Sequence, residues 1–200
     1  VPLLKEILSL MGISCLELPG YEADDLLGTL SAAGRDAGLD VCIVTGDKDS
    51  FQLADDRVTI LQPVTRSGRT ETERYDPAAI LERYQVTPAQ FIDLKAIMGD
   101  PSDNIPGVKG IGEKGAIELI SRYGSLEKIY ESLADLRPAI AEKLRSGQDV
   151  AYLSRQLVTI CRSVPVDIIL ENLAPRPANE ERLTAMFGKL GFLKLMSRLN

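Results

Sequence analysis

The sequence predicts an α/β fold with a mostly parallel sheet, followed by a helical subdomain, on three observations. The apolar, β-branched run VCIVT at 41–45 is typical of a strand buried on both faces of a parallel sheet. Helix-like and strand-like segments alternate through the first half of the chain. After Tyr75, nearly every segment has apolar residues at helical spacing. We therefore expect one compact unit with an α/β region over 1–103 and a helical region over 104–200.

Short elements separated by glycine and proline make up the first half. Apolar residues at helical spacing predict a helix that ends before Gly12, and CLEL at 15–18 is a strand candidate. Residues 22–38 form the next predicted helix, with acidic residues in its first turn, where the helix dipole favours them. VTILQPV at 58–64 is a second strand, and the turn-like SGRT at 67–70 predicts a hairpin with the segment that follows.

Helices are predicted through most of the second half. DPAAILERY and TPAQFIDLKAIMG each begin with a capping residue and then proline, which favours a helix start. Pro165 and the NLAPRP stretch at 172–177 indicate a linker-like passage before the last helices. The other helices are expected at about 113–123, 125–133, 138–146, 149–160, 179–188 and 191–199.

Composition excludes several classes of chemistry. The chain has no histidine, which excludes Ser-His-Asp catalysis and histidine-ligated zinc. Cys15, Cys42 and Cys161 lie among apolar neighbours without metal-knuckle spacing, so we expect buried, reduced thiols. The chain has no apolar run of membrane-spanning length and no signal-sequence pattern, so a soluble, intracellular protein is expected.

Seven acidic residues in three clusters are the candidates for catalysis. Each cluster taken alone has an ordinary structural explanation, as helix-dipole partners, capping residues or turn residues. The first cluster lies at a strand-to-helix junction, the second follows the strand at 41–45, and the third lies between two helices. The clusters are Glu22, Asp24 and Asp25; Asp47 and Asp49; and Asp100 and Asp103.

Taken together, the clusters indicate a metal site. The carboxyl ends of strands form the ligand crevice of an α/β sheet, and the first two clusters fall at such ends. If the third cluster folds over the same edge, all seven carboxylates converge. Gathered carboxylates repel one another, and Lys48 is the local basic neighbour within the clusters. Hard divalent cations such as Mg²⁺ or Mn²⁺ accept oxygen ligands and relieve this repulsion. Two such ions can serve phosphodiester displacement without histidine.

A glycine-punctuated turn at 105–112 is the second functional feature. It opens the helix predicted at 113–123, and exposed N–H groups at a helix N-terminus bind anions. This helix-hairpin-helix pattern grips a nucleic-acid backbone without reading bases, although an ordinary glycine-rich helix connection is the alternative. The predicted DNA-binding residues are Gly107, Val108, Lys109, Gly110, Ile111, Gly112 and Lys114.

The charge distribution is compatible with a DNA substrate. The formal net charge is −6, but residues 1–103 carry 18 acids and 9 bases, whereas residues 104–200 carry 11 acids and 14 bases. Seven of the acids in the first half belong to the clusters, where bound metal would neutralise them. The acidic total therefore does not oppose nucleic-acid binding.

Four motifs occur in order along the chain: EADD, TGDKD, GDPSDNIPGVKGIGEK and YGSLEKIY. Together they resemble the 5′ nuclease domains of bacterial DNA polymerase I, within the flap endonuclease superfamily, and the resemblance covers essentially the whole chain. It implies a PIN-like 5′ nuclease fold with a helix-three-turn-helix motif. It also implies a divalent-metal-dependent 5′→3′ exonuclease that cleaves flaps.

The resemblance places the seven acids on the metal-site carboxylates of the family. The EADD group and an upstream aspartate would hold the first of two Mg²⁺ or Mn²⁺ ions, and the TGDKD and GDPSD pairs the second, partly through water. The resemblance also implies a K⁺ ion at the hairpin turn that bridges to a DNA phosphate. Its ligands would be backbone carbonyls near Val108 and Ile111, with others from Ile97, Met98 and Pro106.

The chain departs from the family at its start. The family begins with a strand that carries a catalytic aspartate and then a basic helical arch, whereas this sequence opens at Val1 in the helix after the arch. We therefore expect an N-terminally truncated nuclease, with the first strand and arch missing. An exposed sheet edge, weakened metal binding and reduced or absent activity would follow.

The leading hypothesis is a phosphodiester hydrolase of DNA replication and repair that removes RNA primers and processes flapped, nicked or branched DNA. We expect a monomer that works at the nucleoid in the bacterial cytoplasm, free-standing or tethered to a polymerase after Asn200. The alternative is a non-catalytic helix-hairpin-helix DNA-binding module. Metal bound near Asp100 and Asp103 would favour the hydrolase over this module. A PIN-like ribonuclease is a third hypothesis, which the GVKGIG turn disfavours because short single-stranded RNA needs no duplex-phosphate grip.

Overall fold

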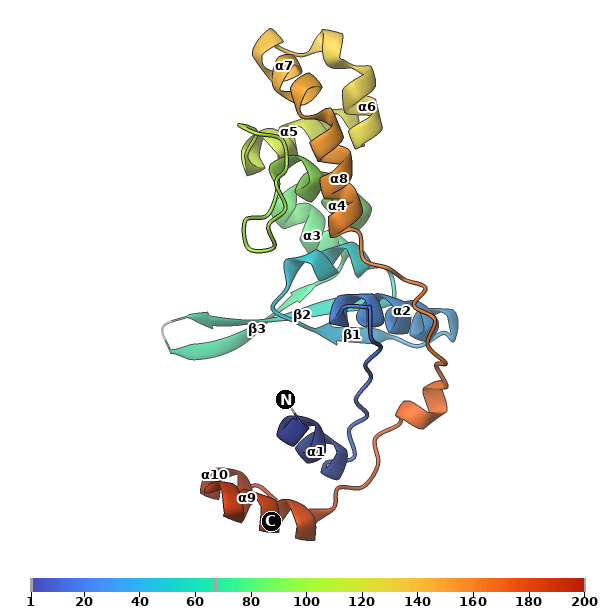
Figure 1. Ribbon diagram of the computed structural model, residues 1–200, viewed down its shortest axis with the longest axis vertical. Coiled ribbons are helices and arrows are strands. Elements are labelled where there is room, and N and C mark those ends of the chain that lie inside the picture. Colours follow the sequence, from blue (N-terminus) through green and yellow to red (C-terminus); the bar gives the residue numbers. More distant parts are fainter. Residues whose placement is uncertain (1, 67, 200) are drawn as a thin grey trace.

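The computed structural model describes residues 2–66 and 68–199 (Figure 1). The helices are α1 (Pro2–Leu10), α2 (Ala23–Asp36), α3 (Pro77–Tyr84), α4 (Pro88–Met98), α5 (Glu113–Tyr123), α6 (Leu126–Glu131), α7 (Pro138–Ser146), α8 (Gln148–Val158), α9 (Glu180–Leu190) and α10 (Leu193–Met196). Strands β1 (Val41–Val44), β2 (Val58–Arg66) and β3 (Arg69–Tyr75) form one sheet, and short 3₁₀ helices are η1 (Lys48–Leu53), η2 (Leu133–Asp135) and η3 (Leu170–Leu173). The sheet and α2 lie at the middle of an elongated molecule, between α3–α8 at one end and α1, α9 and α10 at the other.

The α/β class is confirmed, with a mixed sheet rather than a mostly parallel one. Strand β1 pairs with β2 in parallel, and β2 pairs with β3 as the predicted antiparallel hairpin. Position 67 of the predicted turn lies outside the described residues, and Gly68 has a φ of 79°. The hairpin replaces the crossover that a third parallel strand would need.

Strand β1 is not buried on both faces, contrary to the prediction. Ile43 points into the core, whereas Cys42 is exposed and Val44 keeps 65% of its surface accessible. Within the described part of the chain, β2 is the one strand that pairs with β1. An edge strand loses neighbours on one side, so an apolar sequence alone does not secure its burial.

Two other predictions fail for related reasons. Residues 13–18 form no strand, because this extended segment runs between α1 and α2 without a neighbouring strand to bond (Figure 1). The cysteines are free but not buried. Cys15 lies in that extended segment, Cys42 lies on the open face of β1, and Cys161 is half-buried.

Capping side chains determine where the helices that support the site begin. Asp76 Oδ1 accepts the backbone N–H of Ala79 at 2.9 Å at the start of α3. Thr87 and Gln90 form a reciprocal capping box at the start of α4, which is buried around most of its circumference. The core between the sheet, η1 and α4 contains Phe51, which is fully buried and packs against aromatic rings of β3, α3 and α4.

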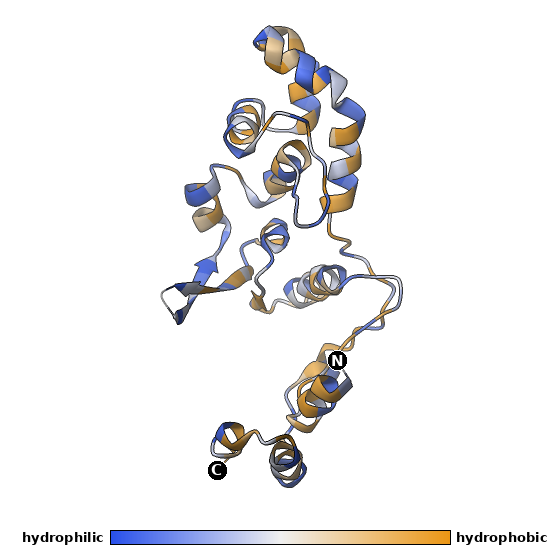
Figure 2. Cartoon of the chain, turned by 60° about the vertical axis from the view of Figure 1, so that its left-hand side comes forward, coloured by the Kyte–Doolittle hydropathy of each residue, from blue (hydrophilic) through white to orange (hydrophobic). Residues whose placement is uncertain are grey.

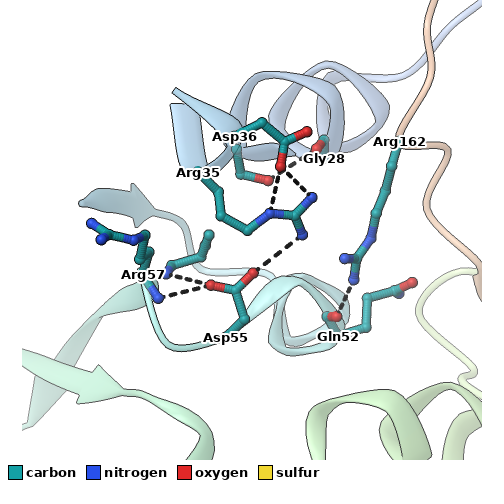
Figure 3. Close-up of polar contacts among 9 residues, drawn as sticks. Gly28, Arg35, Asp36, Gln52, Asp55, Arg57 and Arg162 are labelled. Atoms are coloured by element: carbon teal, nitrogen blue, oxygen red, sulfur yellow. Dashed lines mark hydrogen bonds and ion pairs between the residues drawn. The ribbon is translucent and has the colours of Figure 1, made fainter. Parts of the chain in front are cut away.

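The segment after α8 is fastened to the α/β region by polar contacts. The side-chain oxygen of Gln52 accepts the backbone N–H of Ile160 at 3.0 Å, and Arg162 donates to the carbonyl of Gln52 (Figure 3). Arg35 on α2 reaches Asp55 at 3.4 Å beside them. These contacts hold the returning chain across α2 and η1, next to the acidic clusters.

The chain ends form a separate small helical group. Leu10 of α1 packs with Leu183 and Phe187 of α9, and Figure 2 shows the hydrophobic residues along α1. The helix predicted at 191–199 is reduced to the four residues of α10. Across the described residues, every helix is too short or too polar to span a membrane.

Candidate metal and nucleic-acid site

Asp47 of the second acidic cluster and both acids of the third cluster line one cavity. Its volume is about 540 Å³, and acidic and basic side chains line it together with Gly46 and Ser102. Asp47 lies just after β1, where it accepts the Asp49 N–H at 2.9 Å and caps η1. The turn after α4 contributes the other acids. The charged residues of the lining are Asp47, Lys48, Lys95, Asp100 and Asp103.

A buried lysine joins these two clusters. Lys95 on α4 is 4% exposed, and its Nζ lies 2.6 Å from Asp49 Oδ1 and also pairs with Asp100 Oδ2. Sequence reasoning missed Lys95 and identified only Lys48 as a basic neighbour. The available signal was a lysine inside the apolar helix 91–98, because a buried ammonium requires a carboxylate partner.

Charged groups at and next to the cavity shift one another's pKa values. Hydrogen bonds from Lys95 and Ser102 lower the pKa of Asp100 to about 2. Burial raises the pKa of Asp49, although Lys95 acts in the opposite direction. Burial also acts to lower the pKa of Lys95, but hydrogen bonds with Asp100 and Asp49 outweigh it and the pKa is raised. The lysine therefore stays charged between two acids in different environments.

The acids of the first cluster lie at the start of α2, outside the lining of the cavity. Burial raises the pKa of Asp24, and the charges of Asp25 and Asp47 raise it further, so Asp24 lies within electrostatic reach of the second cluster. Asp25 instead accepts two backbone N–H groups, from Cys161 at 2.8 Å and from Glu22 at 3.2 Å. Glu22 is exposed at the N-cap of α2.

The donor chemistry at the cavity fits a hard divalent cation, but the side chains do not enclose one as they stand. Carboxylate oxygens are the ligands that Mg²⁺ and Mn²⁺ prefer, and Asp47, Asp100 and Asp103 supply them at the lining of the cavity. However, in residues 2–66 and 68–199 no three acidic or cysteine side chains are close enough together to hold a metal ion. Lys95 takes the position between Asp49 and Asp100 instead.

The glycine turn is anchored to two helices. The N–H of Val108 donates to the Ile97 carbonyl of α4 at 2.7 Å, and the N–H of Gly107 donates to the buried hydroxyl of Ser154 on α8 at 3.1 Å. Gly107 has a φ of 58°, and a Cβ there would lie 2.3 Å from Gly99 N, so glycine is required.

Basic side chains surround the exposed part of this turn. Lys143 on α7 donates to the Gly110 carbonyl at 2.9 Å, while Lys109 and Lys114 are exposed. Gly112 begins α5 without a side-chain cap, which leaves N–H groups of the first turn free for an anion.

Comparison with known proteins identifies the family. The model described as "5'-3' exonuclease, N-terminal resolvase-like domain" matches residues 1–85, and the model described as "5'-3' exonuclease, C-terminal SAM fold" matches residues 86–181. The chain belongs to the 5′-3′ exonuclease family. The predicted resemblance is confirmed.

Bacterial DNA polymerases I are similar over the whole chain. The enzyme of Bacillus caldotenax is 41% identical over 199 residues, which is 99% of this chain and 22% of that protein. The enzyme of Bacillus subtilis (strain 168) is 42% identical over 200 residues, which is 100% of this chain and 22% of that protein. The chain thus spans about a fifth of the length of these relatives.

Solved structures share the fold. T5 5′-exonuclease with bound zinc ions is 28% identical with a TM-score of 0.63, covering 73% of this chain and 52% of that one. The catalytic core of Rad2 in complex with DNA substrate has a TM-score of 0.67 at 20% identity, covering 94% of this chain and 62% of that one. The PIN-like 5′ nuclease fold predicted from the sequence is therefore confirmed.

Proposed function

We propose that this chain hydrolyses DNA phosphodiester bonds as a 5′→3′ exonuclease and structure-specific flap endonuclease. The carrying observation is the cavity at which Asp47, Asp100 and Asp103 meet, in a chain of the 5′-3′ exonuclease family. Its carboxylates come from the end of β1 and from the turn after α4, which precedes the glycine turn. The acidic turn and the glycine turn that would bind phosphate are therefore neighbours along the chain.

The proposed ligands for two Mg²⁺ or Mn²⁺ ions are the seven clustered acids. Of these acids, Asp47, Asp100 and Asp103 line the cavity and Asp49 contacts its Lys95. Asp24 lies within electrostatic reach of Asp47, whereas Glu22 and Asp25 would have to leave the helix cap. Bound divalent ions would activate water at neutral pH and neutralise charge on the scissile phosphate. The chain's own carboxylates would hold and orient these ions.

The glycine turn would hold the substrate away from the centre of cleavage. Backbone N–H groups of 107–112, together with Lys109 and Lys114, are suited to phosphates of duplex DNA without reading bases. A K⁺ ion at this turn stays part of the proposal. The Ile97 and Val108 carbonyls expected to bind it each accept a backbone N–H.

The linkage to a polymerase and the cellular role of the chain are also proposals. The relatives named DNA polymerase I are longer than this chain, which supports the proposal that a polymerase follows Asn200. The chain would then process primers and flaps at the nucleoid in the cytoplasm. The monomeric state, the boundary between 103 and 104, and the predicted weakening of activity stay predictions. The assay below, run beside a full-length DNA polymerase I, measures the weakening.

A labelled 5′-flap duplex tests the function directly. We expect cleavage that requires Mg²⁺ or Mn²⁺ and stops with a chelator. Asp100→Asn should lose about a hundredfold in rate or more while still binding the flap. Asp56→Asn, an exposed acid outside the clusters, is the control and should cleave normally. Flap binding without metal-dependent cleavage would favour the non-catalytic DNA-binding module.

A further inference from the structure

Lys95 is a positive charge built into the acidic centre. Its side chain is nearly inaccessible to solvent and lies between carboxylates from two separate segments, η1 and the turn after α4. Buried Asp49 contacts this lysine through Oδ1, which lies 2.6 Å from the Lys95 Nζ and so within hydrogen-bond distance. The lysine is therefore the group that neutralises this pair of acids.

The other lysine of the cavity does not share this position. Lys48 is exposed, and its Nζ lies 5.9 Å from the centre of the Tyr84 ring. A flexible, exposed ammonium is hydrated and only weakly held by its neighbours. Lys95 is instead held by the packed helix α4, so its ammonium stays in contact with Asp49 and Asp100.

We propose that Lys95 is a tethered counter-cation that holds Asp49 and Asp100 in place and competes with divalent cations for them. This inference rests on the metal-dependent function proposed above, and it makes Lys95 a positioning residue. Two carboxylates brought together without a cation repel each other, so the lysine stabilises the arrangement before metal binds. The same charge repels an arriving dication, so the lysine also lowers the affinity of the site.

A purely structural lysine makes different predictions from a competing one. Removal of a structural ion pair lowers stability, and added metal would restore none of it. Removal of a competing cation lowers stability without metal, tightens metal binding, and lets metal restore the loss. Metal affinity and metal-dependent stability therefore separate the two roles without any DNA present.

The test compares the unmodified chain with Lys95→Met, Lys95→Gln and Lys95→Arg. Mn²⁺ binding is measured by the electron paramagnetic resonance signal of free Mn²⁺, and stability by thermal unfolding in chelator and in Mn²⁺. We expect Lys95→Met to bind Mn²⁺ about tenfold more tightly and to regain in Mn²⁺ the melting temperature that it loses in chelator. Lys95→Arg keeps the charge and should not gain affinity. Lys128→Met, on the exposed surface of α6, makes the same charge change at a distance and should match the unmodified chain.

Each outcome either supports or overturns the proposed role of Lys95. If Lys95→Met does not fold, Lys95→Gln provides the measurement, because it keeps hydrogen-bond donors without the charge. Equal Mn²⁺ affinity with and without the lysine overturns this inference while leaving the proposed function intact. Gain of Mn²⁺ binding only in the neutral variants supports it. Failure of every variant to bind Mn²⁺ overturns both this inference and the metal-dependent function.

Discussion

Asp25 clamps the returning chain onto α2, and its replacement should weaken the fold. Its carboxylate accepts N–H groups from Glu22 at 3.2 Å and from Cys161 at 2.8 Å. A hydrogen bond to a charged group contributes about 1.5–3 kcal/mol, so Asp25→Ala should lower the free energy of unfolding by about 3 kcal/mol. For a chain of this length, that corresponds to a drop in melting temperature of roughly 6–12 °C.

Urea unfolding followed by far-UV circular dichroism, in chelator, measures this loss. Asp25→Asn keeps one accepting oxygen and should lose roughly half as much stability as Asp25→Ala. Asp56→Asn controls for the change in charge. An Asp25→Ala variant within about 0.5 kcal/mol of the unmodified chain would refute the clamp. If Asp25→Asn keeps its stability but loses Mn²⁺ binding, the carboxylate acts as a metal ligand.

Three further changes test the fold, the DNA contact and the pH response. Gly28→Ala would place a Cβ 2.7 Å from Ile160 Cγ2 and 2.9 Å from the Cys161 carbonyl, and should cost about 1–3 kcal/mol in the same unfolding assay. Lys109→Ala should weaken DNA binding with little sequence preference, and fluorescence anisotropy at several salt concentrations should show the salt slope reduced by about one. Burial raises the pKa of Tyr75 to about 12, so its contribution to stability is present below its unfolded value of about 10 and is lost as pH rises toward 12. Tyr75→Phe should flatten that loss, measured as urea unfolding at several alkaline pH values.

Local patterns predicted the helices that have their own start signals. Asp76 and Thr87 cap α3 and α4 as the sequence indicated, because a capping side chain bonds residues only two or three positions away. The strand candidate at 15–18 failed because a strand needs a partner elsewhere in the chain. The same dependence explains β1, whose apolar sequence is compatible with a central strand or an edge strand.

The candidate site was predictable in outline but not in its detail. The strand-end rule predicted Asp47 at the ligand edge of the sheet, but it gave no position for Asp100, which lies in a turn between two helices. The different surroundings of the neighbours Asp24 and Asp25 depend on a backbone N–H 136 residues away, which no local pattern reveals. Lys95 was detectable in principle, since an ammonium inside an apolar helix must find an acid.

Helix α4 links the two halves of the proposed site. Lys95 pairs with Asp49 and Asp100, and two residues later the Ile97 carbonyl accepts the Val108 N–H of the glycine turn. A packed helical turn is stiff, so the distance from the carboxylates to the phosphate-binding turn is set by the helix rather than by a flexible loop. Under the proposed function, duplex held at the turn would therefore present its phosphates to the acids at a constant spacing. Cleavage position would then follow from where the duplex is gripped, without any need to read its bases.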